Sequence, residues 1–352
     1  MRRTSLAVLA AVLPAVVSAA GDPLSFEGRE AAVVETEGAV TRRDALDVVV
    51  TSLRLSPSGA RWAARREDGG FLVGDFSGAR HEVPVSDLVF LDEHRALALT
   101  GVDESSTALE LRTVELDGDP RLGRARALPR LDGARLELEA GSLRWRVTGV
   151  DLKKRELVRV AGAVDGADSK ETRWPGPPAE KGLPFSAWSV GSGGAALVVD
   201  RLLGARTGIY RDASDVPPWH SEIWTLAGGA RELLASTSLE LRCLPELSPD
   251  ATCLAVAPRD TYVWAVDARG GRPRPLASVR GRARQETALR DGRIALWIGG
   301  TGLVVLDPAA KRAERIALAD PGGGPTSIAA AGERIGLVLK RHRGSEVVLL
   351  SR

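Results

Sequence analysis

SPSGARWAA (56–64) and SPDATCLAV (248–256) are the two clearest copies of a unit that recurs along the chain. Each copy begins with residues that suit a tight turn, because Pro fixes φ in both copies and Gly accepts a positive φ in the first. An apolar strand rich in Ala, Val, Leu and Trp follows, and this composition favours a strand packed on both faces. Five more divergent copies are DEHRALALT (92–100), EAGSLRWRV (139–147), GSGGAALVV (191–199), RDGRIALWI (290–298) and AGERIGLVL (331–339).

A second element, an alternating hairpin, follows each unit after about ten residues; examples are FLVGDFSGARHEV (71–83) and GLVVLDPAAKRAERIAL (302–318). Each repeat therefore supplies up to four antiparallel strands, at a spacing near the ~40–50 residues of a propeller blade. A four-stranded sheet cannot bury both faces alone, whereas radial packing of several sheets does. The sequence predicts an all-β fold, a β-propeller of seven four-stranded blades, with six or eight as open alternatives.

The two ends of the chain suggest how such a ring closes. The last repeat, SEVVLLSR (345–352), stops after one strand of its hairpin. We expect AAVVETEGAV (31–40) to add the missing strand and complete the final blade. This divides the chain into an N-terminal extension with a ring-closing strand (21–44) and a propeller (45–352).

The two clearest turns resemble the WD40-like (PD40) repeat of TolB-type β-propellers, in which Ser-Pro-Asp-Gly precedes an apolar strand. The matching residues are Ser56, Pro57 and Gly59 in the first copy and Ser248, Pro249 and Asp250 in the second, where Ala251 replaces the Gly. The resemblance implies an interaction platform of the bacterial envelope or an accessory domain of a peptidase. The motif is structural, so it implies a fold and no particular ligand.

Residues 1–20 have the pattern of a secretory signal peptide. Arg2 and Arg3 precede the apolar run LAVLAAVLPAVV (6–17), and the small residues Ser18, Ala19 and Ala20 then suit a peptidase. The run is shorter than the ~20 residues that a membrane-spanning helix needs. We therefore expect a periplasmic or secreted protein without a membrane span.

Composition narrows the function further. The chain has 352 residues with 48 Lys+Arg and 46 Asp+Glu, and loss of Arg2 and Arg3 leaves 46 of each sign. Nucleic-acid binding requires a concentrated basic surface, but we interpret the densest basic stretch (269–284) as a turn plus a solvated strand face. A hydrophobic content of 44% suffices for a large core. We expect a monomeric scaffold or protein-interaction module of the cell envelope that binds a protein partner and no nucleic acid.

The fourth repeat contains RLLGARTGIYRDASDVPPW (201–219), which is far longer than a hairpin requires. Long loops in compact domains are often functional, or else disordered. This one combines aromatic, cationic and carboxylate side chains, a mixture that suits recognition of a polar ligand or a partner chain. An insertion that merely packs over the ring is the alternative. The predicted binding residues are Tyr210, Arg211, Asp212, Asp215, Trp219, His220 and Glu222.

Signals for catalysis, metals and cofactors are weak. The four His are scattered, without metal-ligand spacing, and no Gly-rich phosphate loop precedes a helix. AWSVG (187–191) approaches the nucleophile elbow GxSxG, but a strand rather than a helix follows it. We expect no catalytic residue, metal or cofactor. The alternatives are a propeller-fold enzyme, such as a glycan lyase or hydrolase, and a small-ligand sensor that uses the central channel.

Cys243 and Cys253 are the only thiols. Export to an oxidising compartment favours a disulfide between them. A two-residue turn at 249–250 would instead place Cys243 opposite Val256 and Cys253 on the other face of the sheet. A bulge could restore the register, so a disulfide and two separate buried thiols both remain open.

Overall fold

The structure is a computed structural model. It describes residues 16–18, 23–24, 27–101, 109–138, 143–151, 153–154, 156–166, 168–175, 185–190, 196–202, 219–225, 232–237, 239–244, 251–266, 273–318 and 324–351.

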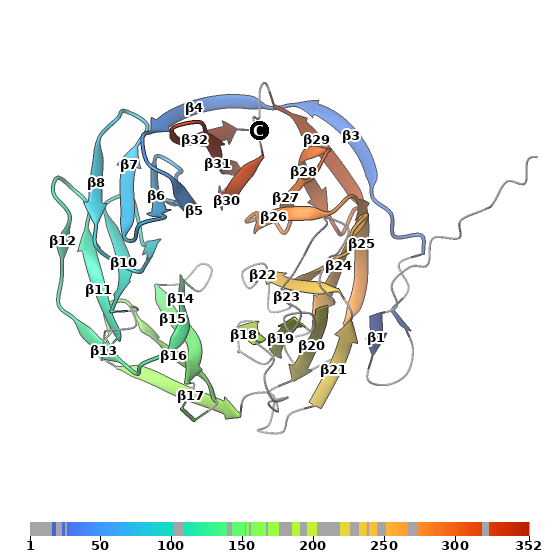
Figure 1. Ribbon diagram of the computed structural model, residues 1–352, viewed down its shortest axis with the longest axis horizontal. Coiled ribbons are helices and arrows are strands. Elements are labelled where there is room, and N and C mark those ends of the chain that lie inside the picture. The colour runs from blue at the N-terminus through green and yellow to red at the C-terminus, as the bar shows by residue number, and fades with distance from the viewer. Residues whose placement is uncertain are drawn as a thin grey trace, which may run out of the picture.

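The strands in these ranges form seven sheets that are arranged around a common centre (Figure 1). Within each sheet, strands that follow one another in the chain are antiparallel neighbours, except that the short strands Arg121–Leu122 and Arg126–Leu128 both pair with the strand Leu109–Glu115. The described residues include no helix. The predictions of an all-β fold and of a β-propeller are therefore confirmed.

The first three sheets follow one another along the chain. The first contains β5 (Val50–Leu55), β6 (Arg61–Arg66), β7 (Phe71–Asp75) and β8 (Arg80–Val83). The second contains β9 (Asp87–Phe90), β10 (Arg95–Thr100), β11 (Leu109–Glu115) and the short β12 (Arg121–Leu122) and β13 (Arg126–Leu128). The third contains β14 (Asp132–Leu138), β15 (Arg144–Asp151), β16 (Glu156–Ala163) and β17 (Ser169–Pro175).

Three of the remaining four sheets include strands from the N-terminal segment. The fourth contains β18 (Phe185–Val190), β19 (Ala196–Leu202), β20 (Trp219–Thr225), β21 (Glu232–Thr237), β1 (Val16–Ser18) and β2 (Pro23–Leu24). The fifth contains β22 (Glu240–Leu244), β23 (Ala251–Val256), β24 (Asp260–Val266) and β25 (Arg274–Arg280). The sixth contains β26 (Ala283–Ala288), β27 (Ile294–Ile298), β28 (Gly302–Asp307), β29 (Arg312–Ala317) and β3 (Ala32–Glu37). The seventh contains β30 (Pro325–Ala331), β31 (Arg334–Arg341), β32 (Gly344–Ser351) and β4 (Ala39–Leu46).

The recurring turn-and-strand unit has one structural role throughout. Its seven copies supply the second strand of the seven sheets, namely β6, β10, β15, β19, β23, β27 and β31. Successive residues Ala96–Leu99 of β10 and Ile335–Leu339 of β31 are all buried. Since neighbouring side chains of a strand point to opposite faces, these strands are covered on both sides, as their composition predicts.

Trp62 and Trp145 show how the unit packs inside a sheet. Both indoles are fully buried, and each Trp lies on the second strand opposite a glycine of the third, Gly74 and Gly162 respectively. A Cβ atom at Gly74 would lie 2.6 Å from Cζ2 of Trp62, and one at Gly162 would lie 2.8 Å from Cζ2 of Trp145. The indoles therefore occupy the space that a larger residue would need.

The hydrophobic core is divided among the spaces between neighbouring sheets. Phe71 and Val73 of the first sheet pack with Leu88 and Phe90 of the second. Similar clusters join the second sheet to the third, the fifth to the sixth, the sixth to the seventh and the seventh to the first. The first, second, sixth and seventh sheets thus bury their two faces against two neighbours, which is the physical reason for a ring.

The N-terminal segment differs from the prediction. The expected ring-closing strand, 31–40, is split between two sheets. β3 pairs parallel with β29 as an added strand of the sixth sheet, and β4 pairs antiparallel with β32 as the fourth strand of the seventh. The split follows from length, because a single strand of the ring accommodates only six to eight of these residues. β1, within the predicted signal peptide, pairs with β21.

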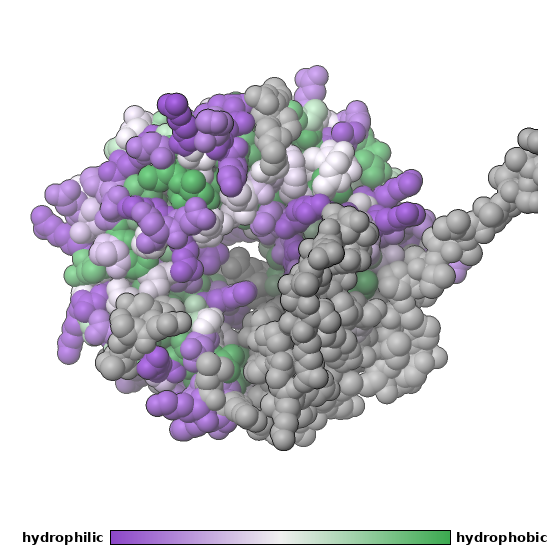
Figure 2. All heavy atoms as spheres, in the orientation of Figure 1, coloured by the Kyte–Doolittle hydropathy of each residue, from purple (hydrophilic) through white to green (hydrophobic). Residues whose placement is uncertain are grey.

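The ring has two faces and a centre. The first strands of the sheets, such as β5, β14, β22, β26 and β30, lie nearest the centre (Figure 1). Because consecutive strands alternate in direction, turns from first to second strand lie at one face, here the turn face. Connections from second to third strand lie at the other, here the loop face. Figure 2 shows an opening near the centre and hydrophilic side chains over much of the described surface.

Candidate functional site

The predicted binding residues Tyr210, Arg211, Asp212 and Asp215 lie outside the described residues. The strands that precede and follow them are described. β19 ends at Leu202 and β20 begins at Trp219, and these two residues pair with each other. The two strand ends that flank residues 203–218 therefore lie side by side at the loop face of the fourth sheet.

The other three predicted residues lie on β20. Trp219 is paired with Leu202, His220 with Arg201 and Glu222 with Val199. The ladder from β18 to β21 fixes the backbone of this strand on both sides. Trp219, His220 and Glu222 therefore lie on a strand that is paired on both sides and that directly follows residues 203–218.

The densest charge network near the centre joins the first strands of the fifth and sixth sheets. The guanidinium of Arg242 lies 2.8 Å from Glu240 on its own strand and 2.8 Å from Glu286 on β26. Arg242 Nη1 also donates to the carbonyl oxygen of Arg284 at 3.1 Å. Arg282 lies 3.6 Å from the second oxygen of Glu240. Two guanidinium groups and two carboxylates thus connect two sheets across their seam.

Burial and charge act in opposite directions in this network. Burial disfavours the charged form of Arg242, but the carboxylates of Glu286 and Glu240 outweigh it and raise the pKa of Arg242 above its usual value. Burial raises the pKa of the Glu286 carboxyl, against the attraction of Arg242. Because each carboxylate already accepts a bond from Arg242, the arrangement holds two strands together rather than presenting a free acid or base.

A second network near the centre connects the first three sheets. Arg54 of β5 lies 3.6 Å from Asp87 of β9. The other oxygen of Asp87 accepts a hydrogen bond from the backbone N–H of Leu136 on β14, at 2.9 Å. One carboxylate therefore bridges the first strands of three consecutive sheets.

The turn face carries a third network, centred on Asp117. Its Oδ1 lies 2.9 Å from Nδ1 of His94 and 3.1 Å from Nη2 of Arg61, so it joins the first and second sheets. The Ser58 N–H donates to Glu93 Oε1 at 2.8 Å, and Arg334 of the seventh sheet donates to the carbonyl oxygen of Ser58. The recurring turns are therefore linked from sheet to sheet.

His94 is the titratable group of this network near neutral pH. The hydrogen bond and charge of Asp117 raise the pKa of His94, and the same bond lowers the pKa of Asp117. Both side chains are largely exposed. The pair is therefore a surface contact whose strength depends on pH.

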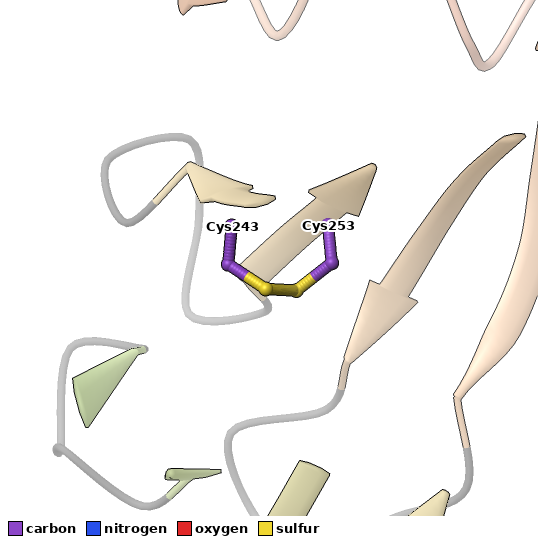
Figure 3. The surroundings of a disulfide bond; sticks show 2 residues. All are labelled: Cys243 and Cys253. Atoms are coloured by element: carbon purple, nitrogen blue, oxygen red, sulfur yellow. A yellow bond between two sulfur atoms is a disulfide. The ribbon is translucent and has the colours of Figure 1, made fainter. Parts of the chain in front are cut away.

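Cys243 and Cys253 lie directly opposite each other on β22 and β23 and form a disulfide (Figure 3). Their Cα atoms are 3.9 Å apart. The predicted register, with Cys243 opposite Val256, is wrong, because Val256 pairs with Glu240. The last paired residues are Leu244 and Thr252, so the connection is longer than the assumed two-residue turn. The observed partner of Cys243 thus differs from the predicted one by an odd number of residues. Because side chains alternate along a strand, such a register error assigns Cys253 to the wrong face of the sheet.

Among the residues that the structure describes, no group of three or more His, Cys, Asp or Glu could hold a metal ion. In the same residues, no helix is long and apolar enough to cross a membrane. Several of the described ion pairs, such as Arg242–Glu286 and Arg54–Asp87, lie at seams between sheets.

Sequence analysis missed the central networks. The interpretation of 269–284 as a solvated face holds for the exposed Arg274 and Arg280, but Arg282 pairs with Glu240 across a seam. One signal was available in the sequence. Charged residues stand two positions apart on first strands, as in Glu240/Arg242 and Arg284/Glu286, and such spacing places both side chains on one face of a strand.

No protein-family model matches this chain, and no curated protein matches its sequence. Solved structures do match its fold. The β-propeller domain of Cps50 (Swd1) from Myceliophteria thermophila has a TM-score of 0.56 at 12% identity, covering 90% of this chain and 99% of that one. Raptor from Chaetomium thermophilum has a TM-score of 0.57 at 14% identity, and the match covers 90% of this chain but 29% of Raptor. These likenesses agree with the sheet topology and identify the fold of this chain as a β-propeller.

Proposed function

We propose that this protein is an exported, non-catalytic β-propeller of the TolB-type WD40-like class that binds a protein partner in the cell envelope. The N-terminal pattern of residues 1–20 supports export to the periplasm or beyond. Cleavage after Ala20 would remove β1, leaving the fourth sheet to end at β21. The Ser-Pro turns at 56 and 248 support the class.

We also propose that the ring has seven blades and that β4 closes it. The seven sheets and the seven copies of the recurring unit support the number. The pairing of β4 with β32 supports closure, since it joins the N-terminal segment to the last strand of the chain. Such closure ties the two ends of a ring together.

One observation carries the binding role. Residues 203–218 connect β19 to β20 at the loop face, whereas residues 299–301 and 342–343 suffice for the same connection in the sixth and seventh sheets. A rigid framework with one extended connection is the usual arrangement for a binding loop. We propose that Tyr210, Arg211, Asp212, Asp215, Trp219, His220 and Glu222 contact the partner.

We propose no catalytic role for the described residues. The half-buried carboxylates of Glu240, Glu286 and Asp87 are each engaged by a guanidinium across or along a seam. A general acid or base needs a proton-transfer position open to a substrate. The described networks use these carboxylates for contacts between sheets, which supports a scaffold.

Affinity capture from envelope extract tests the proposal. The bait is the chain from residue 21, compared with a variant whose residues 203–218 are replaced by a Gly-Ser linker. A matched control replaces residues 102–108, the corresponding connection of the second sheet, in the same way. We expect one or more proteins to be captured by the wild type and the control and lost from the 203–218 variant. Equal capture by all three baits would exclude the loop as the binding site.

A further inference from the structure

The outer edges of the first, second and fifth sheets are protected against pairing with another chain. β8 has four residues and carries Arg80, His81 and Glu82. β12 and β13 are two and three residues long. β25 contains Pro275, and residues 29–31 run alongside it through the Glu30–Ser278 bridge. Short, charged or proline-containing strands are the means by which proteins avoid unwanted strand pairing.

β3 is different. It is six residues long, contains no proline, and forms the end of the sixth sheet, with no described strand on its outer side. Val33 and Val34 are 52% and 41% exposed. Among strand residues whose exposure is described, the one other exposed large hydrophobic residue is Leu122, on the two-residue β12. β3 is therefore an edge strand that exposes two valines beside two carboxylates, those of Glu35 and Glu37.

The backbone of β3 offers a defined set of hydrogen-bonding groups. The N–H of Ala32 donates to the carbonyl oxygen of Lys311, and the strand continues in parallel register with β29. Backbone groups of alternate residues face opposite edges of a strand. The N–H and C=O groups of Val33, Glu35 and Glu37 consequently point away from β29, toward an incoming strand.

Both ends of β3 are held in place, so the edge is already formed. Before it, the N–H of Ala31 donates to Ser278 of the fifth sheet at 2.8 Å. After it, the close packing of Gly38 against Ile316 leads directly into β4. The Glu35 side chain also contacts Arg315 at 2.9 Å. A strand that is fixed in advance lowers the entropy lost when a partner binds.

The side chains of β3 specify what would pair with it. Val33, Glu35 and Glu37 share one face, and Ala32, Val34 and Thr36 share the other, because side chains alternate along a strand. Oppositely charged residues directly across a strand pair stabilise it, and like charges destabilise it. The matching antiparallel strand has basic residues opposite Glu37 and Glu35 and β-branched residues opposite Thr36, Val34 and Val33.

We propose that β3 is a docking edge for an extended, basic and β-branched segment of another protein, which adds to the sixth sheet as an antiparallel strand. A second copy of this chain fits less well, since it would bring two further acidic side chains to the same seam. The site lies on the rim and does not depend on the binding proposed for residues 203–218.

A pair of peptides tests this proposal with the chain from residue 21. One contains Lys-Val-Lys-Val-Val and the other Glu-Val-Glu-Val-Val, and binding is followed by fluorescence anisotropy. We expect the Lys peptide to bind about tenfold more tightly, because two cross-strand charge pairs change sign between the peptides. The preference should weaken at high salt, as exposed charges are screened. Equal affinity for the two peptides would overturn the proposal.

Three variants locate the effect. Glu35→Lys with Glu37→Lys should reverse the preference, whereas Glu82→Lys with Glu333→Lys changes the net charge equally at exposed sites elsewhere and should retain it. Val33→Pro removes an outward N–H that β29 does not use, and should weaken both peptides about tenfold without altering thermal unfolding. Reversal in the control, or retained binding by a folded Val33→Pro variant, would contradict docking at β3. Sedimentation velocity tests the alternative occupant. If the wild type were a dimer and Val33→Pro a monomer, β3 would bind a second copy of this chain, and the proposal of a basic partner segment would be overturned.

Discussion

β3 and β4 are consecutive strands of one segment, yet they contribute to the fold in different ways. β4 is the fourth strand of the seventh sheet, and its Asp44 and Leu46 are 6% and 5% exposed. β3 is added to a sheet that already has four strands, and its valines are exposed. The comparison teaches that position in the ring decides which strand stabilises the fold. Both strands end their sheets, but the fourth strand of a sheet buries side chains such as Leu46, whereas the added fifth strand leaves its valines exposed.

The largest expected effect of a single substitution is at Leu46. It packs in the cluster between the seventh and first sheets, together with Val50, Trp62 and Val347. Leu46→Ala should lower the free energy of unfolding by about 2–5 kcal/mol, because it removes buried apolar surface and leaves a cavity. Urea unfolding followed by Trp fluorescence measures it. Val34→Ala on β3 is the control. If it lowered the free energy of unfolding as much as Leu46→Ala does, β4 would not be the more stabilising of the two strands.

A smaller effect is expected from the charge pairs of the two strands. Arg80 of the first sheet donates to the buried carboxylate of Asp44 on β4. Arg80→Ala should destabilise the protein by about 1–3 kcal/mol, because a buried acceptor loses its partner. Arg315→Ala breaks the exposed pair with Glu35 on β3 and should change stability by about 0–1 kcal/mol. Equal losses in the two variants would show that burial of Asp44 is not the deciding factor.

A still smaller, pH-dependent effect is expected at the turn face, where the contact is exposed as on β3. The pKa of His94 is raised in the folded state by Asp117. Its contribution to stability is therefore complete below the unfolded pKa of about 6.5 and disappears as the pH rises through the higher folded value. His94→Gln should shift the urea midpoint at pH 6 and leave it nearly unchanged at pH 9. A larger effect of His94→Gln at pH 9 than at pH 6 would mean that protonated His94 does not form the stabilising contact with Asp117.

The smallest effect is expected on the exposed face of β3 itself. Val33→Thr changes an exposed side chain while retaining its β-branched shape, so the free energy of unfolding should stay within about 0.5 kcal/mol of the wild type. Thermal unfolding measured by circular dichroism is sufficient. A marked loss would mean that Val33 packs against part of the molecule, and would remove the basis for a free edge.

The sequence allowed the fold to be predicted where local chemistry repeats. Ser-Pro turns and apolar strands such as Ala63–Ala64 follow from residue preferences alone. Of the four Trp inside strands of the repeats, three are fully buried and Trp297 is half-buried. The pairing partners of the N-terminal segment could not be derived in this way. Whether a strand such as β3 joins the sixth or the seventh sheet depends on contacts between residues some 280 to 312 positions apart.

Register and the charge networks were harder to predict for related reasons. The pairing of Cys243 with Cys253 depends on the length of the connection between β22 and β23, which a motif does not specify. The contact between Arg242 and Glu286 joins two sheets, so it depends on how neighbouring sheets rotate against each other. Of the candidate binding residues, Trp219, His220 and Glu222 lie on β20, and the role of all seven stays a prediction.

Amide hydrogen exchange across residues 32–46 tests the central claim, that β4 closes the ring while β3 is an added strand with a free edge. We predict that the amides of β4 that point to β32 exchange only on global unfolding, as slowly as those of the buried β31. The outward amides of Val33, Glu35 and Glu37 should exchange rapidly. Rapid exchange throughout β4, with slow exchange at those three positions of β3, would contradict the account.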